Sequence, residues 1–115
     1  MITSELHLYI LVFNKESLQY EILSIDKDII KPPVVDICKD SNINQMLNNI
    51  FTTYVNIDPS FINFILSDVN IKSEKLIINY YCLMPYHTTI NNSYLLTLYN
   101  NEISSGNLRK IFSLL

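Results

Sequence analysis

Hydrophobic and polar residues follow strand-like patterns over most of this chain. Residues 5–13 are apolar at nearly every position, so both faces of this segment are mostly apolar, as in a central strand covered on two sides. A polar turn at residues 14–17 and a returning strand at 18–25 complete a hairpin. Three more strands are predicted at residues 61–69, 75–84 and 93–99, with a turn at 70–74 between the first two.

One internal segment changes to the helical period. Its apolar residues are spaced by three and four, and they are Ile43, Met46, Leu47, Ile50, Phe51 and Tyr54. Asp40 or Ser41 is expected to cap the start of this helix. Asn56 is expected to end it in a left-handed conformation, before Pro59 prevents continuation.

A second helix is predicted near the end of the chain, capped by Ser104 or Ser105. The apolar residues on one face of this helix are Leu108, Ile111, Phe112 and Leu115. The predicted elements do not alternate regularly between strand and helix. We therefore expect an α+β fold with a mixed, mostly antiparallel sheet, one central amphipathic helix and one C-terminal helix. The length of 115 residues favours a single domain, 1–115.

Composition and charge exclude several classes of protein. A hydrophobic fraction of 49% with only 17% charged residues indicates a packed core and excludes a disordered tail. The net charge of −3 lacks the basic field that non-specific nucleic-acid binding requires. No apolar run approaches the ~20 residues of a membrane span, and no basic leader suggests a signal peptide.

The choice of residues indicates a source and a compartment. Ile, Leu, Asn, Tyr and Lys dominate, Ala is absent and Arg109 is the sole arginine, which favours an AT-rich genome such as that of a phage or another virus. Two cysteines are too few for a disulfide scaffold. We therefore expect a cytoplasmic protein, in the host cytoplasm if the source is viral.

The order and spacing of these elements resemble the Nudix family. The resemblance rests on the hairpin at residues 6–25, the proline-marked loop at 31–33, the helix ending at 54–57, and the strand that closes on residues 83–85. Tyr99 stands where the family commonly has an aromatic residue, before the final helix. The resemblance implies a Nudix-like fold across nearly the whole chain.

The residues that carry the family's metal-dependent chemistry are missing from this sequence. The family's motif has a Gly, a Glu, an Arg-Glu pair and a Glu-Glu pair. If Asn56 and Ile57 end the motif, those places are taken by Val35, Ser41, Asn49–Ile50 and Thr53–Tyr54. No acidic residue lies between positions 41 and 56, and Mg²⁺ requires anionic oxygen ligands. We therefore expect no hydrolase activity, no catalytic residue, no metal and no cofactor.

Histidine and cysteine are the other candidates for chemistry. His7 is expected to be a structural residue on a strand, and His87 to lie in a polar loop. Neither has a nearby carboxylate in the sequence, so no catalytic dyad is predicted. Cys38 precedes the helix, where a thiol can be reactive, but an inert role is favoured. Cys82 is expected to pack within its strand.

Two surfaces are candidates for protein contacts. The uncharged helix face that includes Asn44, Asn48 and Thr52 can be buried with less desolvation cost than a charged face. The C-terminal apolar residues, Ile111, Phe112 and Leu115, either cover the chain's own core, which we favour, or dock into a partner.

Three functional hypotheses follow from these features. The leading one is a catalytically inactive Nudix-like domain that serves as a protein-interaction or assembly module, through a protein partner or self-association. The alternative is a ligand sensor with a nucleotide-sized pocket lined by Pro33, Tyr86 and His87. The third is an enzyme of unrelated chemistry that uses Cys38 or His87.

Overall fold

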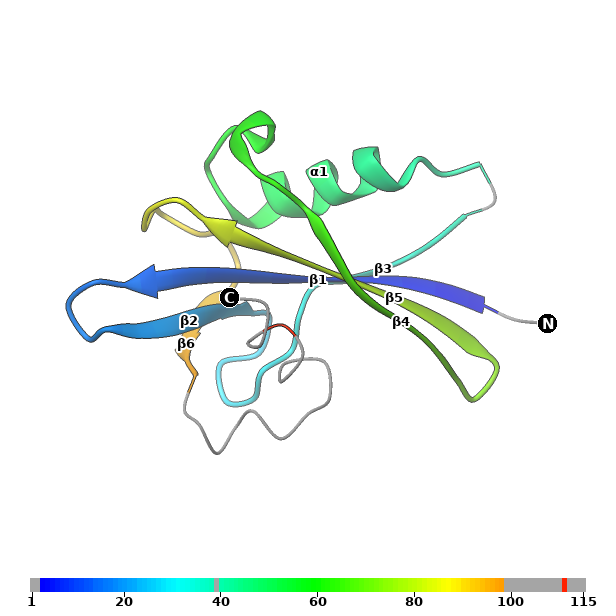
Figure 1. Ribbon diagram of the computed structural model, residues 1–115, viewed down its shortest axis with the longest axis horizontal. Helices are drawn as coiled ribbons and strands as arrows, with labels where there is room; N and C mark the ends of the chain where they lie inside the picture. The colour runs from blue at the N-terminus through cyan, green and yellow to red at the C-terminus, as the bar shows by residue number, and fades with distance from the viewer. Residues whose placement is uncertain (1–2, 39, 99–110, 112–115) are drawn as a thin grey trace.

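A six-stranded mixed sheet with one helix against a face forms the framework of the computed structural model (Figure 1). The structure describes residues 3–38, 40–98 and 111. The elements are β1 (Thr3–Asn14), β2 (Gln19–Ser24), β3 (Val34–Asp36), α1 (Ile43–Tyr54), the single 3₁₀ turn η1 (Pro59–Phe61), β4 (Ile65–Lys72), β5 (Lys75–Met84) and β6 (Tyr94–Thr97). The prediction of a mixed, mostly antiparallel sheet with a central amphipathic helix is confirmed for these residues.

Strand β1 is the centre of the sheet. The strand order is β4-β5-β1-β2-β6, and β5 runs parallel to β1 from the Thr3–Lys75 pair to the Val12–Met84 pair. The other edge of β1 is divided, because β3 pairs with residues 5–7 and β2 pairs with residues 11–14. Both edges of β1 are therefore hydrogen-bonded, as its continuous apolar pattern predicted.

The core has two parts, one on each face of the sheet. Side chains alternate along a strand, so even-numbered and odd-numbered residues of β1 face opposite ways. Leu6, Leu8, Ile10 and Val12 belong to a first cluster with the apolar face of α1. Tyr9 and Leu11 belong to a second cluster, whose other buried members are Ile22, Tyr81, Leu98 and Ile111.

Helix α1 buries the predicted apolar face. Leu47, Ile50 and Phe51 are buried, and Phe51 packs edge-to-face on Phe64 with ring centroids 5.8 Å apart. The predicted cap was wrong by one residue, because the side-chain Oδ1 of Asn42 accepts a hydrogen bond from the Gln45 N–H at 3.2 Å. The Ser41 hydroxyl accepts from the Cys38 N–H instead, at 3.1 Å.

The predicted left-handed stop at Asn56 is also wrong, since Asn56 does not have a positive φ. The helix ends because Val55 is already extended, with φ −122° and ψ 133°, and forms an antiparallel bridge with Ile90. The Asn91 N–H donates to the Tyr54 carbonyl at 2.8 Å. Pairing with a distant segment, and not a local glycine-like conformation, therefore ends α1.

Several element boundaries differ from the sequence prediction for the same reason. β5 is as predicted. β3 follows the proline-marked loop at a place where no strand was predicted, and pairing with β1 makes its three residues extended. The strand expected from residue 61 begins at Ile65 and continues through Lys72, so the turn shortens to Ser73 and Glu74. These two residues have φ of 52° and 60°, as in a two-residue hairpin turn. Leu18 has φ of 58° and closes the β1–β2 turn instead of starting β2.

β6 is shorter than predicted, and Tyr99 lies outside the described residues. Of the predicted C-terminal helix, the structure describes Ile111 alone, which is helical and buried. Among the described residues no helix has both the length and the apolar character needed to cross a membrane.

Asn79 on β5 is buried without a hydrogen-bond partner for its side-chain nitrogen or oxygen among the described residues. A buried unpaired amide costs free energy, so Asn79→Leu is expected to raise the free energy of unfolding by about 1 kcal/mol or more. Urea unfolding measures this change, with exposed Asn48→Leu as the control for leucine substitution. Destabilisation by Asn79→Leu would show that the amide makes a favourable contact.

Candidate functional site

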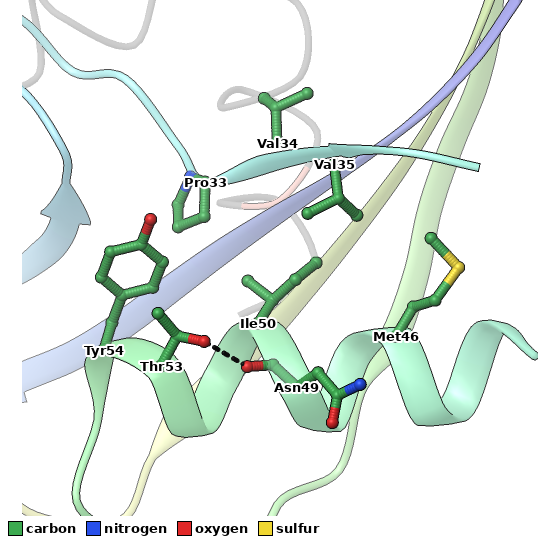
Figure 2. Close-up of a pocket in the computed structure, with 8 residues that line it drawn as sticks. All are labelled: Pro33, Val34, Val35, Met46, Asn49, Ile50, Thr53 and Tyr54. Carbon is green, nitrogen blue, oxygen red and sulfur yellow. Dashed lines mark hydrogen bonds between the residues drawn. The ribbon is translucent and has the colours of Figure 1, made fainter. Parts of the chain in front are cut away.

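A mostly apolar pocket of about 260 Å³ lies between β3 and α1 (Figure 2). Its walls are Pro33, Val34, Val35, Met46, Asn49, Ile50, Thr53 and Tyr54. No lining residue carries a formal charge at neutral pH. The hydroxyl of Thr53 donates to the Asn49 carbonyl at 2.7 Å and is therefore engaged within the helix.

The pocket gathers positions that the sequence resemblance matched to the Nudix motif. Val35, Asn49–Ile50 and Thr53–Tyr54 all line it, whereas Ser41 does not. A Nudix fold implies a divalent cation at such positions, and Mg²⁺ requires anionic oxygen ligands. The residues present do not fit that ion, because their only polar side-chain groups are amide and hydroxyl groups.

Potential metal ligands do not gather elsewhere in the part of the chain that the structure describes. No group of three or more His, Cys, Asp or Glu side chains is placed to hold a metal ion within these residues.

The three residues proposed for a ligand pocket are not brought together. Pro33 is buried and lines the β3–α1 pocket. Tyr86 and His87 line a separate pocket of about 390 Å³. The other walls of this second pocket are Phe13, Asn14, Lys15, Glu16 and Pro85. A single site containing all three residues is therefore not formed.

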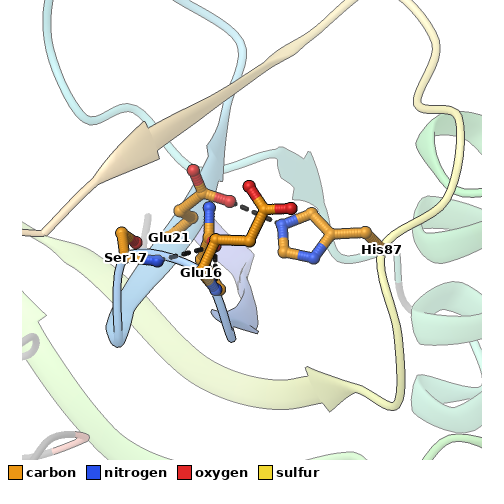
Figure 3. A network of polar contacts seen from close by, with 5 residues as sticks. Glu16, Ser17, Glu21 and His87 are labelled. Atoms are coloured by element: carbon orange, nitrogen blue, oxygen red, sulfur yellow. Dashed lines mark hydrogen bonds and ion pairs between the residues drawn. The ribbon is translucent and has the colours of Figure 1, made fainter.

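His87 forms a side-chain pair that the sequence analysis missed (Figure 3). Its Nε2 lies 2.7 Å from Oε1 of Glu21, which is 66 residues away on β2. No carboxylate lies near His87 in the sequence, but the fold brings one to this ring and so forms a pair where none was predicted. A carboxylate beside an imidazole fixes the ring's orientation. No sequence signal links the two positions, because the contact depends on how the loop after β5 meets β2.

His7 also has a carboxylate partner, Glu5, so the expectation that no carboxylate lies near this ring in the sequence was wrong. Its Nε2 lies 3.2 Å from Glu5 Oε1, and Glu5 Oε2 lies 3.1 Å from Lys75 Nζ. The first of these contacts could have been predicted, because residues i and i+2 of a strand share a face. Hydrogen bonds from His7, and then from Lys75, lower the pKa of the Glu5 carboxyl below its ordinary value of 4.5.

Glu5 therefore predicts a pH dependence of stability. A lowered folded-state pKa means that the ionised carboxylate stabilises the fold above the unfolded-state pKa, and that this contribution is lost as pH falls through the folded-state value. We expect Glu5→Gln to lower the melting temperature by a constant amount above about pH 4.5 and by less below it. Thermal melts at pH values above and below about 4.5 measure the difference in melting temperature between Glu5→Gln and wild type. Exposed Glu74→Gln is the control, and parallel curves for Glu5→Gln and wild type would contradict the prediction.

Cys38 and His87 are not placed together in the structure. Cys82 is buried in the first core cluster, and burial raises the pKa of its thiol. Cys38 is exposed and follows Ile37, whose N–H donates to Ser4 near the start of β1. His87 contacts Glu21, which pairs with Val12 near the other end of β1. Ser4 and Val12 are eight positions apart along β1, which corresponds to roughly 26 Å at 3.3 Å per residue.

The candidate contact surfaces are placed differently by the fold. Asn44, Asn48 and Thr52 are exposed along α1, and the Thr52 hydroxyl donates to the Asn48 carbonyl at 2.9 Å. The Ile111 side chain is buried in the second core cluster and is not on an exposed surface of this chain. Phe112 and Leu115 lie outside the described residues.

Comparisons with known proteins assign the fold. No protein-family model matches the sequence, and no curated protein matches it. The structure is similar to Ap4A hydrolase of C. elegans, with a TM-score of 0.68, 14% identity, and coverage of 99% of this chain and 98% of that chain. It is also similar to a MutT/nudix family protein from Enterococcus faecalis, with a TM-score of 0.63 and 12% identity over 85% of this chain. This chain spans only 44% of that protein.

A third similar structure is the NUDIX domain of Shewanella oneidensis NrtR, solved in complex with ADP ribose. Its TM-score is 0.55 and its identity 11%, with coverage of 84% of this chain and 73% of that domain. At these identities the similarity concerns the fold. The Nudix-like α+β fold implied by the sequence resemblance is therefore confirmed.

Proposed function

We propose that this Nudix-like domain has no hydrolase activity and acts as a protein-interaction or assembly module. The observation that carries the proposal is the β3–α1 pocket, where the positions matched to the catalytic motif form an uncharged, mostly apolar surface. Without a metal ion, this surface has no group to offset the charge that develops on a diphosphate during hydrolysis.

Packing supports the same conclusion. Ile50 is buried in the first core cluster, and Met46 and Tyr54 pack against that cluster. A carboxylate at position 50 would require burial of a charge in apolar surroundings, which is costly without a partner. The helix face that would hold a metal in an active relative therefore serves here as core.

Surface properties favour a role in protein contacts. The exposed face of α1 that includes Asn44, Asn48 and Thr52 has no charge to desolvate. Strand β4 exposes apolar side chains at Leu66 and Ile71. Exposed apolar surface of this kind is typical of interaction sites. The AT-rich composition supports a phage or viral source, and thus action in the host cytoplasm.

A hydrolysis assay tests the proposal. The purified chain is incubated with ADP-ribose or diadenosine tetraphosphate and millimolar Mg²⁺ or Mn²⁺, beside an active Nudix hydrolase as the positive control. We expect no metal-dependent product and no change in melting temperature on adding either ion alone. Metal-dependent turnover that is lost in Asn49→Ala/Thr53→Ala would overturn the proposal, since both residues line the β3–α1 pocket.

A second candidate function, nucleotide sensing, is favoured by the pocket beside His87. This pocket combines the cation Lys15 with the aromatic residues Phe13 and Tyr86. Cations attract phosphate and aromatic rings stack on bases. If the pocket binds ADP-ribose, the melting temperature rises with ligand concentration, and the rise is reduced in Lys15→Ala. A melting temperature that does not change with ADP-ribose concentration would contradict nucleotide sensing.

A further inference from the structure

We infer that two copies of this chain pair through strand β4, in an antiparallel arrangement centred on Asn70. The inference rests on the proposed function as an assembly module and identifies its partner as a second copy. Within the described sheet β4 is an edge strand, hydrogen-bonded to β5 only (Figure 1). Such an edge presents backbone N–H and carbonyl groups to another strand.

The apolar side chains of β4 make this edge suitable for pairing. Leu66, Val69 and Ile71 are 50%, 49% and 70% exposed. Val69 pairs with Ile78, which in turn pairs with Leu6 of β1, so Val69 and Ile71 extend the first core face to the rim of the sheet. A second strand alongside β4 would cover part of this surface.

Proline and bulges, two of the features that protect an edge strand, are missing from residues 68–72. Charged side chains also protect edges, but the charges of Asp68 and Lys72 have opposite signs and can therefore pair with those of a second copy. β4 has no proline, and its one irregularity lies between Leu66 and Asp68. From Asp68 to Lys72 the pairing with β5 is regular, so this segment is straight enough to accept another strand.

The charges favour a second copy of the same chain. Lys72 lies directly opposite Lys75 in the β4–β5 hairpin, and Lys75 is already paired with Glu5. No ion pair found among the described residues involves Lys72. Asp68 lies four residues earlier on the same face of the strand. The strand therefore carries an acid and a base at equal distances from Asn70.

Antiparallel pairing around Asn70 matches these groups with one another. Asp68 lies opposite Lys72 of the second copy, and Val69 lies opposite Ile71 of the second copy. The two-fold symmetry repeats each pair, so the interface is self-complementary. Centring the pairing on Ile71 instead would place Lys72 opposite Asn70 and leave Asp68 beyond the end of the second copy's strand, so neither charge would be matched.

The carboxylate of Asp68 can join such a pair while it keeps contacts within the chain. In one of these, its Oδ1 accepts a hydrogen bond from the Val69 N–H at 2.8 Å. An ionised carboxylate has two oxygens and accepts several hydrogen bonds. Contacts within the chain and an ion pair with the Lys72 of a second copy are therefore compatible.

Sedimentation or light scattering over a concentration series tests this inference. The wild type is expected to show a concentration-dependent dimer. Lys72→Glu and Asp68→Lys each place like charges opposite one another in both symmetry-related pairs of the interface. Each is therefore expected to weaken dimerisation by about tenfold or more. The double variant Asp68→Lys/Lys72→Asp restores opposite charges and is expected to recover most of the affinity. Exposed Lys27→Glu, in the loop after β2, is the matched charge-change control.

The outcomes separate this inference from the proposed function. A wild type that stays monomeric, or single variants that dimerise like wild type, would overturn the β4 interface whatever the hydrolysis assay shows. Metal-dependent turnover by a β4 dimer would overturn the inactive-domain proposal and leave the interface in place. Melting curves of each variant confirm folding, and Ile71→Thr provides a further interface variant that keeps β-branching on the strand.

Discussion

Replacing Phe51 with alanine is expected to lower the free energy of unfolding by about 3–5 kcal/mol. Phe51 is a fully buried member of the first core cluster, and its ring meets Phe64 at an interplanar angle of 77°. Truncation removes the ring's buried surface and its aromatic contact, and leaves a cavity between α1 and the sheet. Denaturant unfolding measures the loss, which is a large share of the 5–15 kcal/mol typical of a domain.

Two control variants show whether the loss of stability in Phe51→Ala comes from the buried ring. Phe51→Leu keeps the site apolar and is expected to cost less than Phe51→Ala. Thr52→Ala alters the neighbouring, exposed residue and is expected to change stability by no more than about 0.5 kcal/mol. If Phe51→Ala cost less than about 1 kcal/mol, α1 would not be packed on the sheet as described.

Replacing Ile111 with alanine is expected to cost about 2–4 kcal/mol, the second largest effect. Ile111 is fully buried in the second core cluster with Tyr9, Leu11 and Tyr81. Its truncation therefore opens a cavity on the face of the sheet opposite α1. Unfolding in denaturant measures the loss, and the self-association of folded protein is expected to stay unchanged.

The Ile111 experiment distinguishes core packing from an interface role. An interface residue would alter association and leave the stability of the isolated chain nearly intact. Loss of association without loss of stability would therefore contradict the packing described here. Phe61→Ala is the matched control, because Phe61 is 78% exposed and its truncation is expected to change stability by no more than about 0.5 kcal/mol.

The β3–α1 pocket is the part of the fold on which the proposal of an inactive domain depends. The backbone of this chain brings positions at β3 and along α1 together. Activity depends on the side chains placed there. In this chain Val35, Ile50 and Tyr54 turn the same place into an apolar surface, which is why we propose a role other than hydrolysis.

Elements whose hydrophobic pattern repeats over many residues could be predicted from the sequence alone. The even and odd positions of β1 are both apolar, and this predicted a central strand with two covered faces. The spacing of apolar residues in α1 predicted its buried side, and the alternation in β5 predicted its bounds. The pattern within one segment indicates which of its faces is buried, so it can be interpreted without knowing which other element covers that face.

Features that depend on a partner far away in the chain became known from the three-dimensional fold. β3 is a strand because it pairs with residues 5–7 of β1, on the part of that edge that β2 does not cover. α1 ends where Val55 forms a bridge with Ile90. The His87–Glu21 pair and the separation of Pro33 from Tyr86 and His87 follow from how loops meet the sheet. Hydrogen bonds between distant segments leave no periodic signal in the sequence, and for that physical reason they could not be predicted from it.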